Sequence, residues 1–101
     1  MKHHQYRITV EHLATPNVDD KLNQPLVFTA SNHDDVFKIK ERISGKLGLK
    51  PTAEAPFIVG LKLISEVMLT HRKIPLFIET QGLILQLIKT LKAHIRQSEI
   101  S

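Results

Sequence analysis

Histidine is the richest reactive residue type in this sequence of 101 residues, with six copies. A histidine can act as a general base or bind a transition metal. His3 and His4 are adjacent where the chain begins to alternate like a strand, so their side chains point to opposite faces and make a poor metal pair. No HExxH, HxH or i, i+4 histidine pair occurs. We therefore expect no metal site.

Two other places hold residue types that can do chemistry. His12 continues the inward face of the first predicted strand and is a candidate functional residue, although a buried histidine more often only hydrogen-bonds a backbone carbonyl. Glu66 lies four residues after Lys62 on the most apolar segment, where an i, i+4 ion pair is the simple interpretation. The more specific interpretation is that Glu66 is a buried acid with a raised pKa. A single acid without a second acid or a nucleophile is a thin basis for an enzyme.

The segment from Ser31 to Asp35 contains the residue types of a catalytic triad. Neighbours within one turn cannot align as nucleophile, base and orienting acid, so capping of a helix explains them better. Ser31 is the predicted N-cap, Asp34 the capping-box acid, and Asp35 a favourable charge near the helix start. His33, Asp34 and Asp35 stay candidates because exposed carboxylates here would accept an arginine from a partner.

Missing motifs exclude several functions. The chain has no cysteine, which excludes disulfides, zinc–thiolate sites and a thiol nucleophile. Its four glycines form neither GxGxxG nor GxxxxGK, so no phosphate-binding loop is expected. We expect no cofactor and assign no enzyme activity.

Charge is uneven along the chain. Residues 1–37 hold three basic and five acidic side chains, whereas residues 38–101 hold eleven basic and five acidic ones. Two predicted helix faces carry the candidate anion-binding residues, which are Lys38, Arg42, Lys46, Lys89, Lys92 and Arg96. The chain has one tyrosine and no tryptophan, so few aromatic side chains could stack on bases. Solvated helix faces are therefore the simpler interpretation, and a nucleic-acid or polyanion site is the alternative.

The elements that must position these residues begin with a hairpin. Residues 6–13 alternate apolar and polar side chains, and residues 26–30 form a second short strand pattern. Residues 14–25 contain two prolines and have no apolar period, so they predict a long loop. The two strands most simply pair antiparallel.

Helical periodicity follows. A first helix is predicted from Ser31 to Leu47, ended by Gly48, and a second from Pro56 to Thr70. The second is apolar almost all round, which is typical of a helix pressed between layers or against a partner. Its candidate interface residues are Phe57, Leu61, Ile64 and Met68.

The C-terminal part leaves two alternatives. Pro75 begins a third helix, or residues 74–79 form a short third strand. Gly82 predicts a break or kink, an apolar stripe follows, and residues 95–101 read as a frayed tail.

Length and composition predict one small domain over residues 1–101, with 42% hydrophobic and 24% charged residues. The most apolar segment is shorter than a bilayer span, and the first residues lack the apolar stretch of a secretory signal. We expect a cytoplasmic protein that does not enter a membrane.

Four segments together carry a family resemblance. They read HQYRITVEHL, NHDD, GLKLISEVML and PLF, and they resemble a family of small bacterial proteins known only as a domain of unknown function. The resemblance extends to about His94. It implies a bacterial single-domain protein in which Pro75–Phe77 is helical, and it supplies no activity, cofactor or catalytic residue.

The sequence therefore predicts an α+β fold, with an antiparallel β-hairpin packed against three α-helices in the order β-β-α-α-α. The leading functional hypothesis is a non-catalytic interaction or regulatory module that associates with itself or with another protein. A nucleic-acid or polyanion binder is the second hypothesis, and a small enzyme or ligand carrier using Glu66 and His12 is the third.

Overall fold

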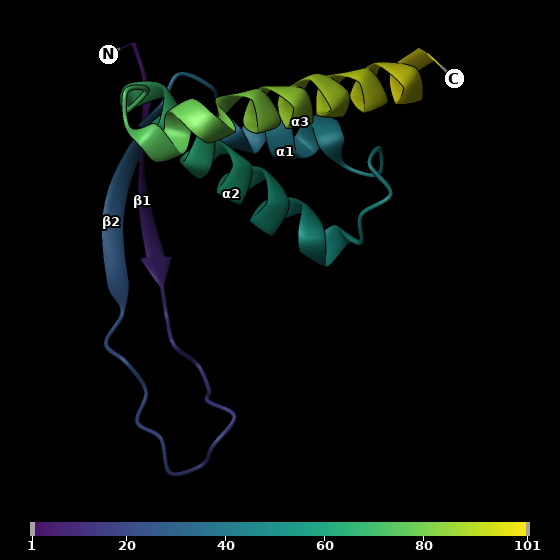
Figure 1. Cartoon of the computed structure of the whole chain (residues 1–101). Coiled ribbons are helices and arrows are strands. Elements are labelled where there is room, and N and C mark those ends of the chain that lie inside the picture. The colour runs from purple at the N-terminus through teal and green to yellow at the C-terminus, as the bar shows by residue number, and fades with distance from the viewer. Residues whose placement is uncertain (1, 101) are drawn as a thin grey trace. The chain divides into compact units, whose positions relative to one another are not determined.

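The computed structural model describes residues 2–100, which divide into two compact units between His33 and Asp34 (Figure 1). The first unit is a hairpin and the second is helical, and each is described by itself. The elements are β1 (His4–Val10), β2 (Leu26–Asn32), α1 (Val36–Ile43), α2 (Pro51–Thr70) and α3 (Pro75–Ile100). This order confirms the predicted β-β-α-α-α fold.

The hairpin pairs β1 and β2 antiparallel, from His4 opposite Asn32 to Val10 opposite Leu26. Tyr6 and Ile8 lie on the same face of β1 and are half-buried, as the alternation predicts. Strand β1 ends three residues earlier than expected, and the connection over residues 11–25 contains no helix or strand.

The predicted cap of α1 is wrong. Ser31 pairs with Gln5 inside the sheet, because β2 continues two residues beyond its expected end. Asp35 is the N-cap instead, and its Oδ1 accepts hydrogen bonds from the backbone N–H groups of Phe37 (3.0 Å) and Lys38 (3.3 Å). An aspartate caps a helix as well as a serine does, so the helix simply starts later.

The end of α1 and the start of α2 also differ from the prediction. Helix α1 ends at Ile43 rather than Leu47, since Gly45 already adopts a positive φ of 73°. Helix α2 begins at Pro51, where a missing N–H costs nothing, and Pro56 lies inside it. At that inner position the proline removes one backbone hydrogen bond of the helix.

Helix α3 is continuous over 26 residues, or about 39 Å. Its start at Pro75 confirms the helix that the resemblance implies and rules out the strand over residues 74–79. The helix continues through Gly82, where we expected a break, and residues 95–100 are helical where we expected a frayed tail.

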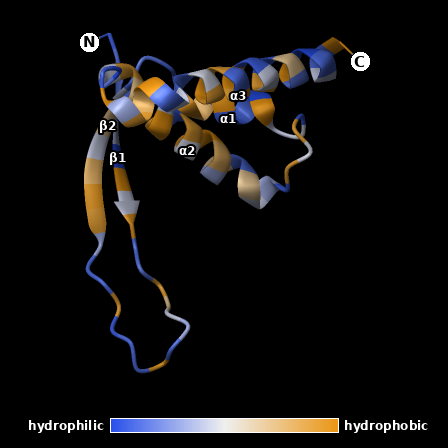
Figure 2. Ribbon diagram, viewed as in Figure 1, coloured by the Kyte–Doolittle hydropathy of each residue, from blue (hydrophilic) through white to orange (hydrophobic). Residues whose placement is uncertain are grey.

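The core of the helical unit is a small cluster to which all three helices contribute. It consists of Ile43 from α1, Ile58 and Leu61 from α2, and Ile95 from α3. Partly buried side chains surround it, namely Val36, Ile39, Leu47, Phe57, Val59, Ile84, Ile88 and Leu91. Figure 2 shows that apolar residues occur along all three helices. In the part of the chain that the structure describes, no helix has both the length and the apolar character of a bilayer span.

Candidate functional site

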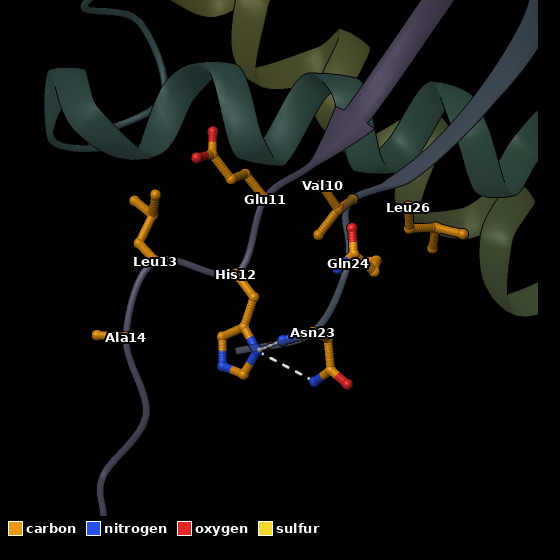
Figure 3. A pocket seen from close by; sticks show the side chains of 8 residues that line it. All are labelled: Val10, Glu11, His12, Leu13, Ala14, Asn23, Gln24 and Leu26. Carbon is orange, nitrogen blue, oxygen red and sulfur yellow. Dashed lines mark hydrogen bonds between the residues drawn. The ribbon is translucent and has the colours of Figure 1, made fainter. Parts of the chain in front are cut away.

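A depression of about 470 Å³ lies where the hairpin opens into its long connection (Figure 3). Strand pairing ends at Val10 and Leu26, and the two chain segments separate beyond that pair. The depression is lined by Val10, Glu11, His12, Leu13, Ala14, Asn23, Gln24 and Leu26. It therefore holds one of the predicted candidates, His12.

His12 joins the two ends of the connection. Its Nδ1 accepts the backbone N–H of Asn23 at 3.0 Å and lies 3.1 Å from Nδ2 of the same residue. A backbone N–H can only donate, so Nδ1 is the acceptor in this contact. The predicted bond to a backbone carbonyl is thus wrong, because the ring is the acceptor.

The side chains next to His12 in the sequence lie on the other side of the chain. Glu11 and Leu13 point away from the side on which His12 lies (Figure 3), as expected for successive residues of an extended chain. Among the side chains that line the depression, Glu11 carries the only carboxylate, and it lies on the other side of the chain from the His12 ring (Figure 3). A structural role as a cross-link explains its contacts.

The carboxylates that follow β2 are engaged within the helical unit. Oδ2 of Asp34 binds Nζ of Lys62 at 2.6 Å, which makes its predicted capping-box role wrong. Asp35 is used as the N-cap. The same contact removes Lys62 from the predicted pair with Glu66, which is half-buried and forms no ion pair among the described residues.

His33 lies across the hairpin from His3. The two ring centroids are 6.4 Å apart and the ring planes meet at 81°. The pair lies one step beyond the last paired residues, His4 and Asn32. Its partners are thirty positions apart in the sequence, so no local motif could reveal it.

Among residues 2–100 the buried acid is Glu54, which sequence reasoning missed. Its side chain is almost fully buried and its Oε2 accepts the backbone N–H of Gly45 at 2.8 Å, while Nζ of Lys40 lies 4.0 Å from Oε1. Glu54 thereby fastens the turn after α1 to the first turn of α2. The sequence does contain a signal, which is an acid three residues after Pro51. It indicates a first-turn acid only if the helix is taken to start at that proline.

The two basic faces differ in the structure. Glu99 binds Arg42 at 3.2 Å and Lys46 at 3.0 Å, where α3 runs alongside α1 (Figure 1). These hydrogen bonds, to Arg42 above all, lower the pKa of Glu99 to about 2. Over residues 2–100, the second face has no such partner, since its exposed Lys89, Lys92 and Arg96 form no ion pair.

The predicted interface on α2 is largely internal. Leu61 and Met68 are buried, and Phe57 packs against the core. Only Ile64 is well exposed, at 50%.

Three of the exposed leucines of α3 form a stripe instead. Leu76, Leu83 and Leu87 are 59%, 72% and 42% exposed. With Thr80 they follow a spacing of four, three and four residues, which places them on one side of the helix. We call these four positions the outer seam.

Helix α3 thus has two apolar faces. Ile84, Ile88, Leu91 and Ile95 pack on the core, and the more exposed outer seam lies on the flank of that face, turned from it by about 80° around the helix axis. Sequence analysis identified only the first face, because it placed a break at Gly82.

Among residues 2–100, no group of three or more histidine, cysteine or acidic side chains lies close enough to hold a metal ion.

Comparison with known proteins agrees with the resemblance found in the sequence. A family model described as a domain of unknown function with a solved structure, DUF3861, matches residues 4–93. The crystal structure of a protein of unknown function from Pectobacterium atrosepticum superposes with a TM-score of 0.79 and is 38% identical, covering 90% of this chain and 98% of that chain. No similar protein is found among curated proteins.

Proposed function

The chain belongs to the DUF3861 family of domains of unknown function, and we propose that it is a non-catalytic interaction module that pairs with a second copy of itself through α3. The observation that carries this proposal is the outer seam. Three leucines at coiled-coil spacing face solvent on a helix whose other apolar face already packs on the core.

The energetics favour burial of the outer seam. Burial of a fully exposed leucine side chain contributes about 1.5–3 kcal/mol. The three leucines are 42–72% exposed, so each would contribute part of that amount on each of two copies. Scattered surface leucines are ordinary, but a continuous stripe of them marks a contact surface.

The composition of the outer seam favours a second copy as the occupant. None of its four positions is charged, so two copies of α3 can meet across a two-fold axis without burying an unpaired charge. The same residues then contribute from both sides, which is the arrangement of an isologous dimer.

The test uses two leucines of the same helix. Leu83→Glu places a charge in the outer seam, whereas Leu85→Glu places it on a different side of α3 at a residue of similar exposure, 63% against 72%. By sedimentation velocity at micromolar concentration, we expect the wild type and Leu85→Glu to be dimeric and Leu83→Glu to be monomeric. Equal effects of the two substitutions would contradict the seam as the contact.

A second candidate function rests on the unpaired basic face of α3. Lys89, Lys92 and Arg96 are exposed along one side of the helix, where phosphate groups of a polyanion would find three cations without competing carboxylates.

Fluorescence anisotropy with mixed-sequence DNA and RNA at low salt tests this candidate. Replacing the three residues by glutamine should abolish binding that weakens steeply with salt. A control variant replaces Lys50, Arg72 and Lys73 by glutamine. These residues are also exposed, so the control removes the same amount of positive charge from other places on the protein. Absence of binding by the wild type at low salt would eliminate the candidate.

A further inference from the structure

Two histidines meet at the end of the hairpin that adjoins the helical unit in the sequence. Because His4 lies opposite Asn32, the next pair outward is His3 with His33, and their ring centroids are 6.4 Å apart. This cross-strand pair is independent of the depression around His12 and of the outer seam. From this pair, we propose that His3 and His33 bind one divalent transition metal ion of the Zn²⁺, Ni²⁺ or Cu²⁺ class.

The spacing of the rings suits such an ion. A metal 2.0–2.1 Å from an imidazole nitrogen lies roughly 3 Å from the ring centroid, so two rings on one ion have centroids about 5 Å apart at a tetrahedral angle and about 6.5 Å apart when opposite. The observed 6.4 Å lies within this range. Imidazole nitrogen is a preferred ligand for these three ions.

The hydrogen bonding of an imidazole is compatible with metal binding. Each ring has two nitrogens, so one binds the ion while the other keeps a hydrogen-bond partner, as in most histidine sites. His4 does not compete for the same ion, because it stacks on Tyr6 with centroids 6.2 Å apart and follows His3 on the opposite face.

Two protein ligands define the character of the site. Among the described residues, no group of three or more histidine, cysteine or acidic side chains is placed to hold an ion, so water would fill the remaining coordination positions. Such an open site exchanges its metal readily and binds more weakly than a closed structural zinc site with four protein ligands.

Metal binding would also fasten the hairpin. A two-stranded sheet alone is marginally stable, and the pair joins its strands at the end opposite to the long connection. An ion that binds only the paired strands stabilises them by linkage.

The first experiment needs no variant. Zn²⁺ is added to the isotopically labelled full chain while the imidazole NMR signals are followed. We expect the His3 and His33 rings to shift together at micromolar to sub-millimolar Zn²⁺, with the His12 and His94 rings unchanged. If His33 does not respond, or no ring responds up to millimolar Zn²⁺, the proposal is overturned.

The second experiment measures affinity by calorimetry with Zn²⁺ and Ni²⁺. His3→Gln and His33→Gln should each weaken binding at least about tenfold. His4→Gln is the matched control, since it removes a neighbouring strand histidine from the other face and should leave the affinity unchanged. Wild-type affinity in His33→Gln, with the helical content verified by circular dichroism, would show that the pair is not the site.

Discussion

At the residue scale, most of the side chains whose types could do chemistry form hydrogen bonds or ion pairs within the protein. Asp35 caps α1, Asp34 binds Lys62, and His12 accepts the backbone N–H of Asn23. Sequence spacing identified these residues as polar groups in special places, but it could not supply their partners. Asp34 and Lys62 are far apart in the chain, and only the packing of α2 brings them together.

Among the polar side chains, Glu54 is the one whose loss we expect to cost most stability. Glu54→Ala leaves the backbone N–H of Gly45 without its acceptor, which should lower the free energy of unfolding by about 1–3 kcal/mol. Urea unfolding measures this change. Glu54→Gln keeps an oxygen acceptor of the same length and is the control, so a loss as large as that of the alanine variant would contradict the hydrogen bond as the cause.

Glu99 makes stability depend on pH. Its pKa is lowered from 4.5 to about 2 by hydrogen bonds to Arg42 and Lys46, so the folded chain holds this proton less tightly than the unfolded chain does. The stabilisation is therefore complete above the unfolded pKa and is lost as pH falls from about 4.5 towards 2.

Glu99→Gln isolates this effect, because glutamine does not titrate. We expect thermal unfolding to show a lower Tm for the variant at neutral pH and a wild-type advantage that shrinks as the pH falls through that window. An advantage that stays constant over the same pH range would contradict the assignment.

At the element scale, the types and order of the elements were predictable, and several of their ends were not. Alternation identified both strands, and helical spacing identified all three helices. The helix cap was misplaced because β2 extends by pairing with β1, which is a long-range contact that local signals do not report. Pro51 and Pro56 both suit the start of a helix, and the choice between them depends on the burial of Glu54.

Helix α3 shows that the sequence alone also does not tell which apolar residues face solvent. The alternation of its two apolar faces is visible in the sequence, but only the fold shows that Ile88 and Ile95 face the core while Leu83 faces solvent. The predicted interface on α2 was wrong for Leu61 and Met68, since a helix that is apolar nearly all round can be covered by its own chain.

At the scale of the whole molecule, the core of the helical unit is small relative to the apolar surface that remains outside it. Four buried residues form the central cluster, whereas the outer seam exposes three leucines on a single helix. Pairing of two copies would bury that stripe and extend the core across the contact.

The wild-type chain itself provides the most direct test of this account. Sedimentation equilibrium over a series of concentrations should give a mass that approaches twice the 11.5 kDa of the chain as the concentration rises through the micromolar range. A mass that stays at 11.5 kDa at every concentration would contradict self-association through α3.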